Sequence, residues 1–144
     1  MGRPETGDTA VRCLLDANVN RAREGLRVIE DTARFVLHEA RASAALRQIR
    51  HRLDRLVRAH YRGLLSSRDV GHDPGRSNRA VPYRGGIPEL LAANFKRCEE
   101  SLRALEEYGR VLSKGVVTAA QALRFEVYAW EKRFLKGRHR HSET

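Results

Sequence analysis

The sequence is poor in several residue types, and each shortage excludes a class of protein. It has only two cysteines, Cys13 and Cys98, which belong to no CxxC or Cys/His cluster, so a zinc site or a redox motif finds no support. Aromatic residues make up only 6% of the chain and provide no interleaved stacking platform for single-stranded nucleic acid. No apolar run approaches membrane-spanning length. We therefore expect both cysteines to be buried thiols in a reducing cytoplasm.

Targeting segments and common nucleotide-binding motifs are missing as well. The chain contains neither GxxxxGK[ST] nor GxGxxG, so any nucleotide would need an unusual site. The N-terminal residues lack the apolar core of a signal peptide, and the C-terminal residues carry no anchor motif. We expect flexible ends at residues 1–11 and 136–144 and a single domain at residues 12–135 in a cytoplasmic protein.

Acidic residues are too few to balance the basic ones. The 28 Lys and Arg residues exceed the 18 Asp and Glu residues, which gives a formal net charge of +10. Such a charge attracts phosphates, carboxylates or nucleic acid, and does not choose among them. With 144 residues, of which 41% are hydrophobic, the chain is long enough for one domain with its own core.

Apolar residues recur at helical spacing in four segments. The first segment covers residues 12–38, the second follows a predicted cap at Ser43, the third opens at Pro88, and the fourth opens at Thr118. Between the second and third segments, residues 63–88 are rich in glycine and proline, which is typical of an irregular connection. The pattern predicts an all-α protein with a long central loop.

The first and third segments repeat each other. The string ANVNRAREGLRVIEDTARFV matches AANFKRCEESLRALEEYGRV, and Asn18 aligns with Asn94, an offset of 76 residues. The residues shared by the two copies are Ala17, Asn18, Arg21, Glu24, Leu26, Arg27, Glu30 and Arg34 in the first and Ala93, Asn94, Arg97, Glu100, Leu102, Arg103, Glu106 and Arg110 in the second. Each copy is followed by a Leu-Arg pair, at Arg47 and Arg124. This duplication predicts a four-helix bundle made of two repeated helical hairpins.

Within each copy, Asn, Arg and Glu residues three apart form a polar ribbon along the helix. Asn18 and Asn94 fall on the apolar side of the helix and Arg21 and Arg97 lie at its border, so these side chains are expected to point between helices. A buried arginine needs an anionic partner or a bound anion. Solvated ion pairs are the alternative. Retention of the ribbon in both copies favours a functional role, because a repeated core needs only apolar residues.

Two further segments are suited to anions. The second helix carries six arginines against a single acidic residue, Asp54, which is suited to phosphate, to acidic helices or simply to solvent. The loop stretch RDVGHDPGRSNR combines backbone N–H groups with guanidinium groups that can surround an anion, although a solvated loop has the same composition. His51 and His60 lack partners at metal-ligand spacing and are interpreted as structural.

The strings DANVNRAREGLRVIEDTARFVL, LLSSRDVGHD and NFKRCEESLRALEEYGRVL, the last followed by LRFEVYAWEKR, resemble a known family. They are similar to the small hydroxymethylpyrimidine-phosphate kinase domain of bacterial thiamine biosynthesis, which occurs alone or fused ahead of thiamine-phosphate synthase. The resemblance covers about residues 12–135. Because the chain ends without a synthase barrel, it is expected to be the standalone form.

The resemblance implies an ATP-dependent and Mg²⁺-dependent phosphotransferase that converts hydroxymethylpyrimidine phosphate to the diphosphate. Phosphoryl transfer needs positive groups around the phosphates and a carboxylate-held Mg²⁺. On the matching motif positions, the expected catalytic residues are Glu24, Glu100, Arg27 and Arg103. The expected substrate-binding and phosphate-binding residues are Asn18, Arg21, Asn94, Arg97 and Arg68. The expected metal ligands are Glu24, Asp69 and Asp73.

The expected partners are the phosphorylated pyrimidine and ATP, with a second copy of the chain and a separate thiamine-phosphate synthase as further candidates. No membrane or nucleic-acid partner is expected. Without the resemblance, three alternatives stay open: a metal-independent helical enzyme of the chorismate-mutase kind, a basic helical nucleic-acid binder, and a helical interaction module. The interleaving of arginine with glutamate speaks against a continuous nucleic-acid-binding stripe.

Overall fold

The computed structural model describes residues 4–77, 81 and 83–136, and these residues form helices and connections without a β-strand. The all-α class is therefore confirmed. The helical elements are α1 (Pro4–Asp31), the π-helical turn η1 (Thr32–Val36), α2 (Ala40–Arg58), α3 (Tyr61–Ser67), the 3₁₀ turn η2 (Pro74–Ser77), α4 (Ile87–Leu112) and α5 (Lys114–Leu135). The described residues thus contain five α-helices where we expected four, because the short α3 extends into the segment 63–88 that was predicted to be irregular.

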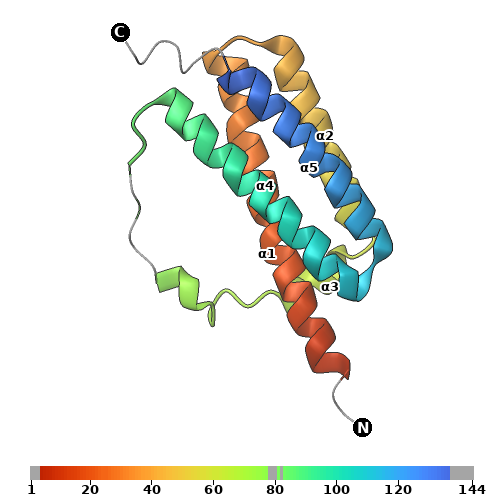
Figure 1. Cartoon of the computed structure of the whole chain (residues 1–144). Coiled ribbons are helices and arrows are strands. Elements are labelled where there is room, and N and C mark those ends of the chain that lie inside the picture. Colours follow the sequence, from red (N-terminus) through yellow and green to blue (C-terminus); the bar gives the residue numbers. More distant parts are fainter. Residues whose placement is uncertain (1–3, 78–80, 82, 137–144) are drawn as a thin grey trace.

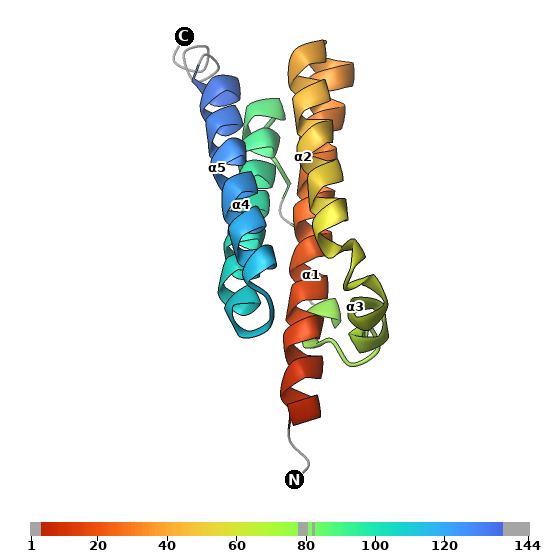
Figure 2. The ribbon, with the colours of Figure 1, turned by 90° about the vertical axis from the view of Figure 1, so that its right-hand side faces the viewer.

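The four long helices run side by side (Figures 1 and 2). α1 and α2 are antiparallel neighbours, and so are α4 and α5. The two pairs meet mainly along α1 and α4, and α2 also contacts α5. α1 and α4 approach each other closely at Gly25, since a Cβ atom there would lie 3.2 Å from the backbone oxygen of Asn94. A side chain at this position would push the two helices apart.

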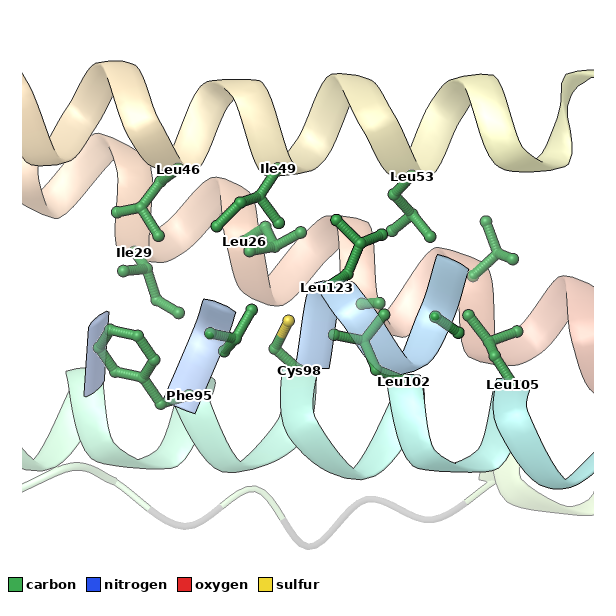
Figure 3. Packing of buried hydrophobic residues seen from close by; sticks show 14 of the residues in the cluster. Leu26, Ile29, Leu46, Ile49, Leu53, Phe95, Cys98, Leu102, Leu105 and Leu123 are labelled. Carbon is green, nitrogen blue, oxygen red and sulfur yellow. The ribbon is translucent and has the colours of Figure 1, made fainter. Parts of the chain in front are cut away.

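Apolar side chains from all four long helices fill the space between them (Figure 3). The fully buried side chains labelled there lie at the three-and-four spacing that the sequence showed. They include Leu26 and Ile29 of α1, Leu46 and Leu53 of α2, Leu102 and Leu105 of α4, and Leu123 of α5. Burial of these residues provides the main favourable contribution to folding.

The ends of the first helix differ from the prediction. α1 begins at Pro4, so residues 4–11, which we expected to lie outside the domain, are helical. Proline suits the first turn of a helix, where its missing N–H is not needed. At the other end, α1 passes into η1, and Thr32 Oγ1 donates a hydrogen bond to the Val28 oxygen at 2.7 Å. The chain then turns at His38, whose φ of 53° is left-handed.

The other predicted helix starts also need correction. α2 begins at Ala40 without a side-chain cap, so Ser43 lies inside the helix instead of capping it. α5 begins at Lys114 because Ser113 is its N-cap, with the Val116 N–H donating to Ser113 Oγ at 3.4 Å. Thr118 therefore lies within α5. The prediction was right at α4, where Pro88 occupies the first turn.

The two cysteines differ in their exposure to solvent. Cys98 is buried, and burial raises the pKa of its thiol, but Cys13 is exposed, contrary to expectation. No helix in the described part of the chain is long and apolar enough to span a membrane. The expected flexibility of residues 1–3 and 137–144 falls outside the described residues.

Candidate functional site

A buried pair of Glu and Arg joins the two helices of each hairpin. Glu30 of α1 accepts two hydrogen bonds from Arg50 of α2, at 2.9 and 3.4 Å. In the same way Glu106 of α4 accepts two from Arg124 of α5, at 2.5 and 3.0 Å. These hydrogen bonds raise the pKa of both guanidinium groups. We call each pair a clasp.

The clasps correct one detail of the repeat. The equivalent of Arg124 is Arg50, whereas the sequence comparison paired Arg124 with Arg47. Arg47 instead donates from Nε to His51 Nε2 at 3.3 Å on the exposed face of α2. Glu30 and Glu106, the last glutamates of the two polar ribbons, are therefore structural residues.

The two ribbon asparagines also occupy equivalent environments. The Nδ2 atom of Asn18 donates to the Leu14 oxygen at 2.8 Å, and that of Asn94 donates to the Leu90 oxygen at 2.9 Å. Asn18 is buried and Asn94 is half-buried, as their apolar-side positions predicted. Each amide uses one of its two N–H groups on its own helix, so one donor and the carbonyl oxygen remain for other contacts.

The arginines at the border of the ribbon are exposed instead of pointing between helices. Arg97 of α4 reaches across to α1, where its Nη2 atom lies 3.5 Å from Glu24 Oε2. Both side chains are more than half exposed, so water screens this ion pair and the interaction is weak. Arg21 lies 3.5 Å from the Asn18 oxygen on the same helix. Glu24 thus keeps a free face toward solvent.

That free face lines a groove of about 310 Å³ on the first hairpin. The groove is lined by Asn20, Arg23, Glu24, Arg27 and Arg50. Three guanidinium groups and one carboxylate therefore surround it, and each arginine is paired with an acid outside it, Arg27 only loosely with the partly exposed Asp31 at 3.5 Å. Arg23 Nε lies 2.8 Å from Asp54, and Arg50 is held by its clasp. The groove is thus positively charged and partly preorganised, which suits an anionic compound.

Several predicted site residues lie elsewhere. Glu100 is exposed on α4, and Arg103 pairs with Glu107 at 2.7 Å on the same helix. Arg68 makes a two-pronged ion pair with the buried Asp16 of α1, both contacts at 2.8 Å. This pair fixes the end of α3 against α1 and occupies the guanidinium group that we expected to bind phosphate.

The expected metal ligands are also separated. Asp69 contacts the His72 ring at 2.8 Å, and Asp73 accepts from the Gly75 N–H at 2.9 Å, so both shape the exposed connection. In residues 4–77, 81 and 83–136, no three His, Cys, Asp or Glu side chains gather as a metal-binding group. The structure therefore does not bring Glu24, Asp69 and Asp73 together.

The groove contains residues that sequence reasoning missed. Arg23 and Asn20 were passed over because they do not recur in the second copy, where Glu99 and Lys96 stand at the equivalent positions. Arg50 was recognised only as one of the six arginines on its helix. No local motif marks Arg50, because the buried glutamate and the facing arginine are 20 residues apart in the first hairpin and 18 apart in the second.

The fold and the groove define a class, a small all-α protein with an arginine-lined surface groove. The chain belongs to the ThiD2 family, whose model matches residues 13–133. It is 38% identical over 130 residues to thiamine-phosphate synthase of Nostoc punctiforme and 39% identical over 131 residues to that of Thermosynechococcus vestitus. The alignments cover 89% and 90% of this chain but 36% of each relative, so the chain spans about a third of their length. No solved structure matches the chain at a significant level.

Proposed function

We propose that the protein is a cytoplasmic kinase of thiamine biosynthesis that phosphorylates hydroxymethylpyrimidine phosphate with ATP. The observation that carries the proposal is the groove on the first hairpin, where Glu24 stands among Arg23, Arg27 and Arg50. Membership of the ThiD2 family and the similarity to thiamine-phosphate synthases support the pathway. The kinase activity itself rests on the groove and on the motif strings that resemble such kinases.

Phosphoryl transfer from ATP does not require the protein to form a covalent bond to the substrate. An oxygen of the substrate phosphate forms a bond to the γ-phosphorus of ATP, while the bond from that phosphorus to the β,γ-bridging oxygen breaks and ADP leaves. The acceptor oxygen is already ionised, so a strong general base is not required. What the protein must supply is positive charge around the phosphates and correct positioning.

The groove residues fit these tasks. Arg27 and Arg23 would hold phosphate oxygens, since their guanidinium groups offer paired N–H donors. Mg²⁺ is usually held by one or two carboxylates together with substrate phosphates and water, so Glu24 alone is a sufficient protein anchor. Bound Mg²⁺ would neutralise charge on the phosphates. Asp69, Asp73 and Arg68 are engaged elsewhere, and we assign them no role in this groove.

The ribbon residues outside the groove keep proposed supporting roles. Arg21 and Arg97 are exposed next to Glu24 or its helix and would attract the anionic substrate. The remaining N–H and carbonyl groups of Asn18 and Asn94 match the donor and acceptor of an aminopyrimidine edge. Glu100 and Arg103 would act in the same way as Glu24 and Arg27 if the second copy also takes part.

The proposal extends to the architecture and the partners. The matching clasps and matching asparagine bonds support a four-helix bundle of two repeated hairpins, with α3 as an addition to the first. A second copy of the chain and a separate thiamine-phosphate synthase are the proposed protein partners. The synthase is proposed because it would consume the diphosphate product.

The test is to incubate the purified protein with ATP, Mg²⁺ and either the pyrimidine phosphate or the free hydroxymethylpyrimidine. We expect ADP and the pyrimidine diphosphate from the phosphorylated substrate, with little turnover of the free alcohol, because the arginines then lack their phosphate partner. An Arg27→Ala variant should raise KM for the pyrimidine phosphate. Absence of ADP formation with the phosphorylated substrate would refute the kinase proposal.

A further inference from the structure

A second hollow adjoins the groove at the junction of α2 and α3 and has a volume of about 560 Å³. It is lined by Arg23, Asp54, Val57, Arg58, Ala59, Tyr61 and Arg62. Figure 2 shows α3 at the C-terminal end of α2 and beside α1. The Asp16–Arg68 pair holds the end of α3 in this position, and the Arg12 side chain packs against Gly63. The hollow is therefore formed by anchored helices.

The charge of this hollow is unbalanced. Arg23 is paired with Asp54 at 2.8 Å, which leaves Arg58 and Arg62 as the other charged side chains of the lining. Within the described part of the chain, neither of these two arginines has an ion pair or a hydrogen-bond partner. Two unpaired guanidinium groups four residues apart lie on one face of the chain and offer paired donors to an anion.

The same hollow contains an exposed aromatic ring. Tyr61 is 55% exposed, although its neighbours on α3 pack against α1. A planar ring beside guanidinium groups is suited to stacking a nucleobase while the arginines bind its phosphates. The volume lies within the range of pockets that hold small organic ligands. A phosphate ion alone would leave most of it empty.

The second hairpin has the equivalent hollow with different chemistry. The clasps align Arg50 with Arg124, so Val57, Arg58, Tyr61 and Arg62 correspond to Glu131, Lys132, Leu135 and Lys136, which line a hollow of about 400 Å³. There the ring is replaced by leucine, and Glu131 places a carboxylate among the lysines, 3.4 Å from Lys96. The combination of an aromatic ring with unpaired arginines therefore belongs to the first hairpin.

Arg23 lines both the hollow and the groove that holds Glu24 and Arg27. A ligand that extends from Tyr61 past Arg23 would therefore bring its far phosphate to Glu24. From this geometry we infer that the α2–α3 hollow binds a nucleoside polyphosphate, with its base on Tyr61 and its phosphates on Arg58, Arg62 and Arg23. This assignment deepens the proposed kinase function and rests on it for the identity of the second substrate.

Calorimetric titration of the 144-residue chain with ADP tests the assignment, with inorganic tripolyphosphate and adenosine as partial probes. We expect Arg58→Ala and Arg62→Ala each to raise the dissociation constant for ADP and for tripolyphosphate about tenfold, the usual effect of one charged hydrogen bond. Tyr61→Leu, which copies Leu135, should weaken ADP and adenosine but leave tripolyphosphate unchanged. Lys132→Ala and Lys136→Ala are the matched controls in the second hairpin and should bind all three probes like the unaltered protein.

Because these side chains are exposed, amide NMR spectra should show that every variant is folded and should place the ADP-induced shifts on residues 57–62. Normal ADP binding by both arginine variants, or equal losses in the lysine controls, would overturn the assignment. If ADP binds as expected but the pyrimidine phosphate is not converted, the kinase proposal fails and the nucleotide site stands. If conversion proceeds while the arginine variants bind ADP normally, the nucleotide site fails and the kinase proposal stands.

Discussion

The two hairpins, α1–α2 and α4–α5, contain matching polar contacts but carry opposite charges at one position of their first helices. Each has a clasp between a buried glutamate and an arginine, and each has an asparagine bonded to its own helix. Where the first hairpin has Arg23 on an open groove, however, the second has Glu99, which is only 3% exposed. This single reversal of charge separates a basic, solvent-facing surface from an acidic, buried one.

The buried acid is part of a small cluster. Lys96 lies 3.5 Å from Glu99 and 3.4 Å from Glu131, and one oxygen of each carboxylate has no hydrogen-bond partner in the described structure. Burial, together with the negative charge of Glu131, raises the pKa of Glu99 to about 7. The second hairpin thus balances its charges internally, whereas the first leaves arginines available to a ligand. The comparison teaches that residues shared by both copies, Glu24 and Arg27 among them, do not by themselves make the two surfaces alike, and that the unrepeated Arg23 distinguishes the first.

The largest expected effect tests what the hairpins have in common. Glu30→Ala and Glu106→Ala should each lower the free energy of unfolding by about 3–5 kcal/mol, because each leaves a largely buried guanidinium group without its partner. Urea denaturation of the two variants measures this. Glu107→Ala is the control, since Glu107 pairs only on the exposed surface of α4 and should cost less than about 1 kcal/mol. A large loss for one clasp and not the other would show that the hairpins are not structurally equivalent.

The next effect tests the functional difference. Glu24→Gln should lower kcat/KM of the proposed kinase reaction about 100-fold to 1000-fold, because it removes the carboxylate that is proposed to hold Mg²⁺ against the phosphates. Glu100→Gln, at the equivalent position of the second copy, should have a much smaller effect. Steady-state rates of both variants, with thermal unfolding to confirm their fold, decide the matter. Equal losses would mean that the two copies form one composite site.

A pH experiment addresses the buried cluster. The raised pKa of Glu99 means that the folded protein still binds a proton that the unfolded chain, whose glutamate has its ordinary pKa of about 4.5, has already released. The free energy of unfolding should therefore fall by on the order of 3 kcal/mol as pH rises from about 4.5 to about 7, and it should stay level above pH 7. Glu99→Gln should remove this slope. An unchanged slope in that variant would assign the titration to another group, and Glu100→Gln serves as the exposed control.

The smallest effect compares the two cysteines. Cys13 on α1 is exposed, and Cys98 on α4 is buried with a raised thiol pKa, so only the first should react with iodoacetamide in the folded protein. Mass spectrometry after a short reaction should find one modified site and an unchanged melting temperature. Rapid modification of Cys98 under native conditions would show that α4 opens far more readily than the packing implies.

Much of the fold could be predicted from the sequence, because apolar periodicity reports directly on which face of a helix is buried. The duplicated first helices could be predicted for the same reason, down to the buried Asn18. Helix starts were predicted less well, since Ser113, Ser43 and Thr118 have comparable capping chemistry and only the surrounding turn decides which of them caps. Because Ser113 is the N-cap, α5 begins at Lys114, four residues before the predicted start at Thr118.

The candidate site was harder to predict, because it depends on how two helices are aligned. Glu30 and Arg50 are 20 residues apart, whereas Glu106 and Arg124 are 18 apart, so the connection in the first hairpin is two residues longer. A comparison at one fixed offset therefore loses the alignment after the first helix and pairs Arg124 with the wrong arginine. The groove lies between α1 and α2 of the first hairpin, and it includes Arg23, which has no equivalent arginine in the second copy. Neither feature leaves a local motif.

Each clasp lies wholly within one hairpin, and the hairpins meet mainly through their apolar core. A hairpin can therefore be treated as an interchangeable part in protein design. A chain assembled from two copies of the second hairpin should keep both clasps and most of the core while lacking the arginine-lined groove. Such a chain would be an inert scaffold, on which the side chains of the groove could be restored one at a time to learn how few are needed for binding.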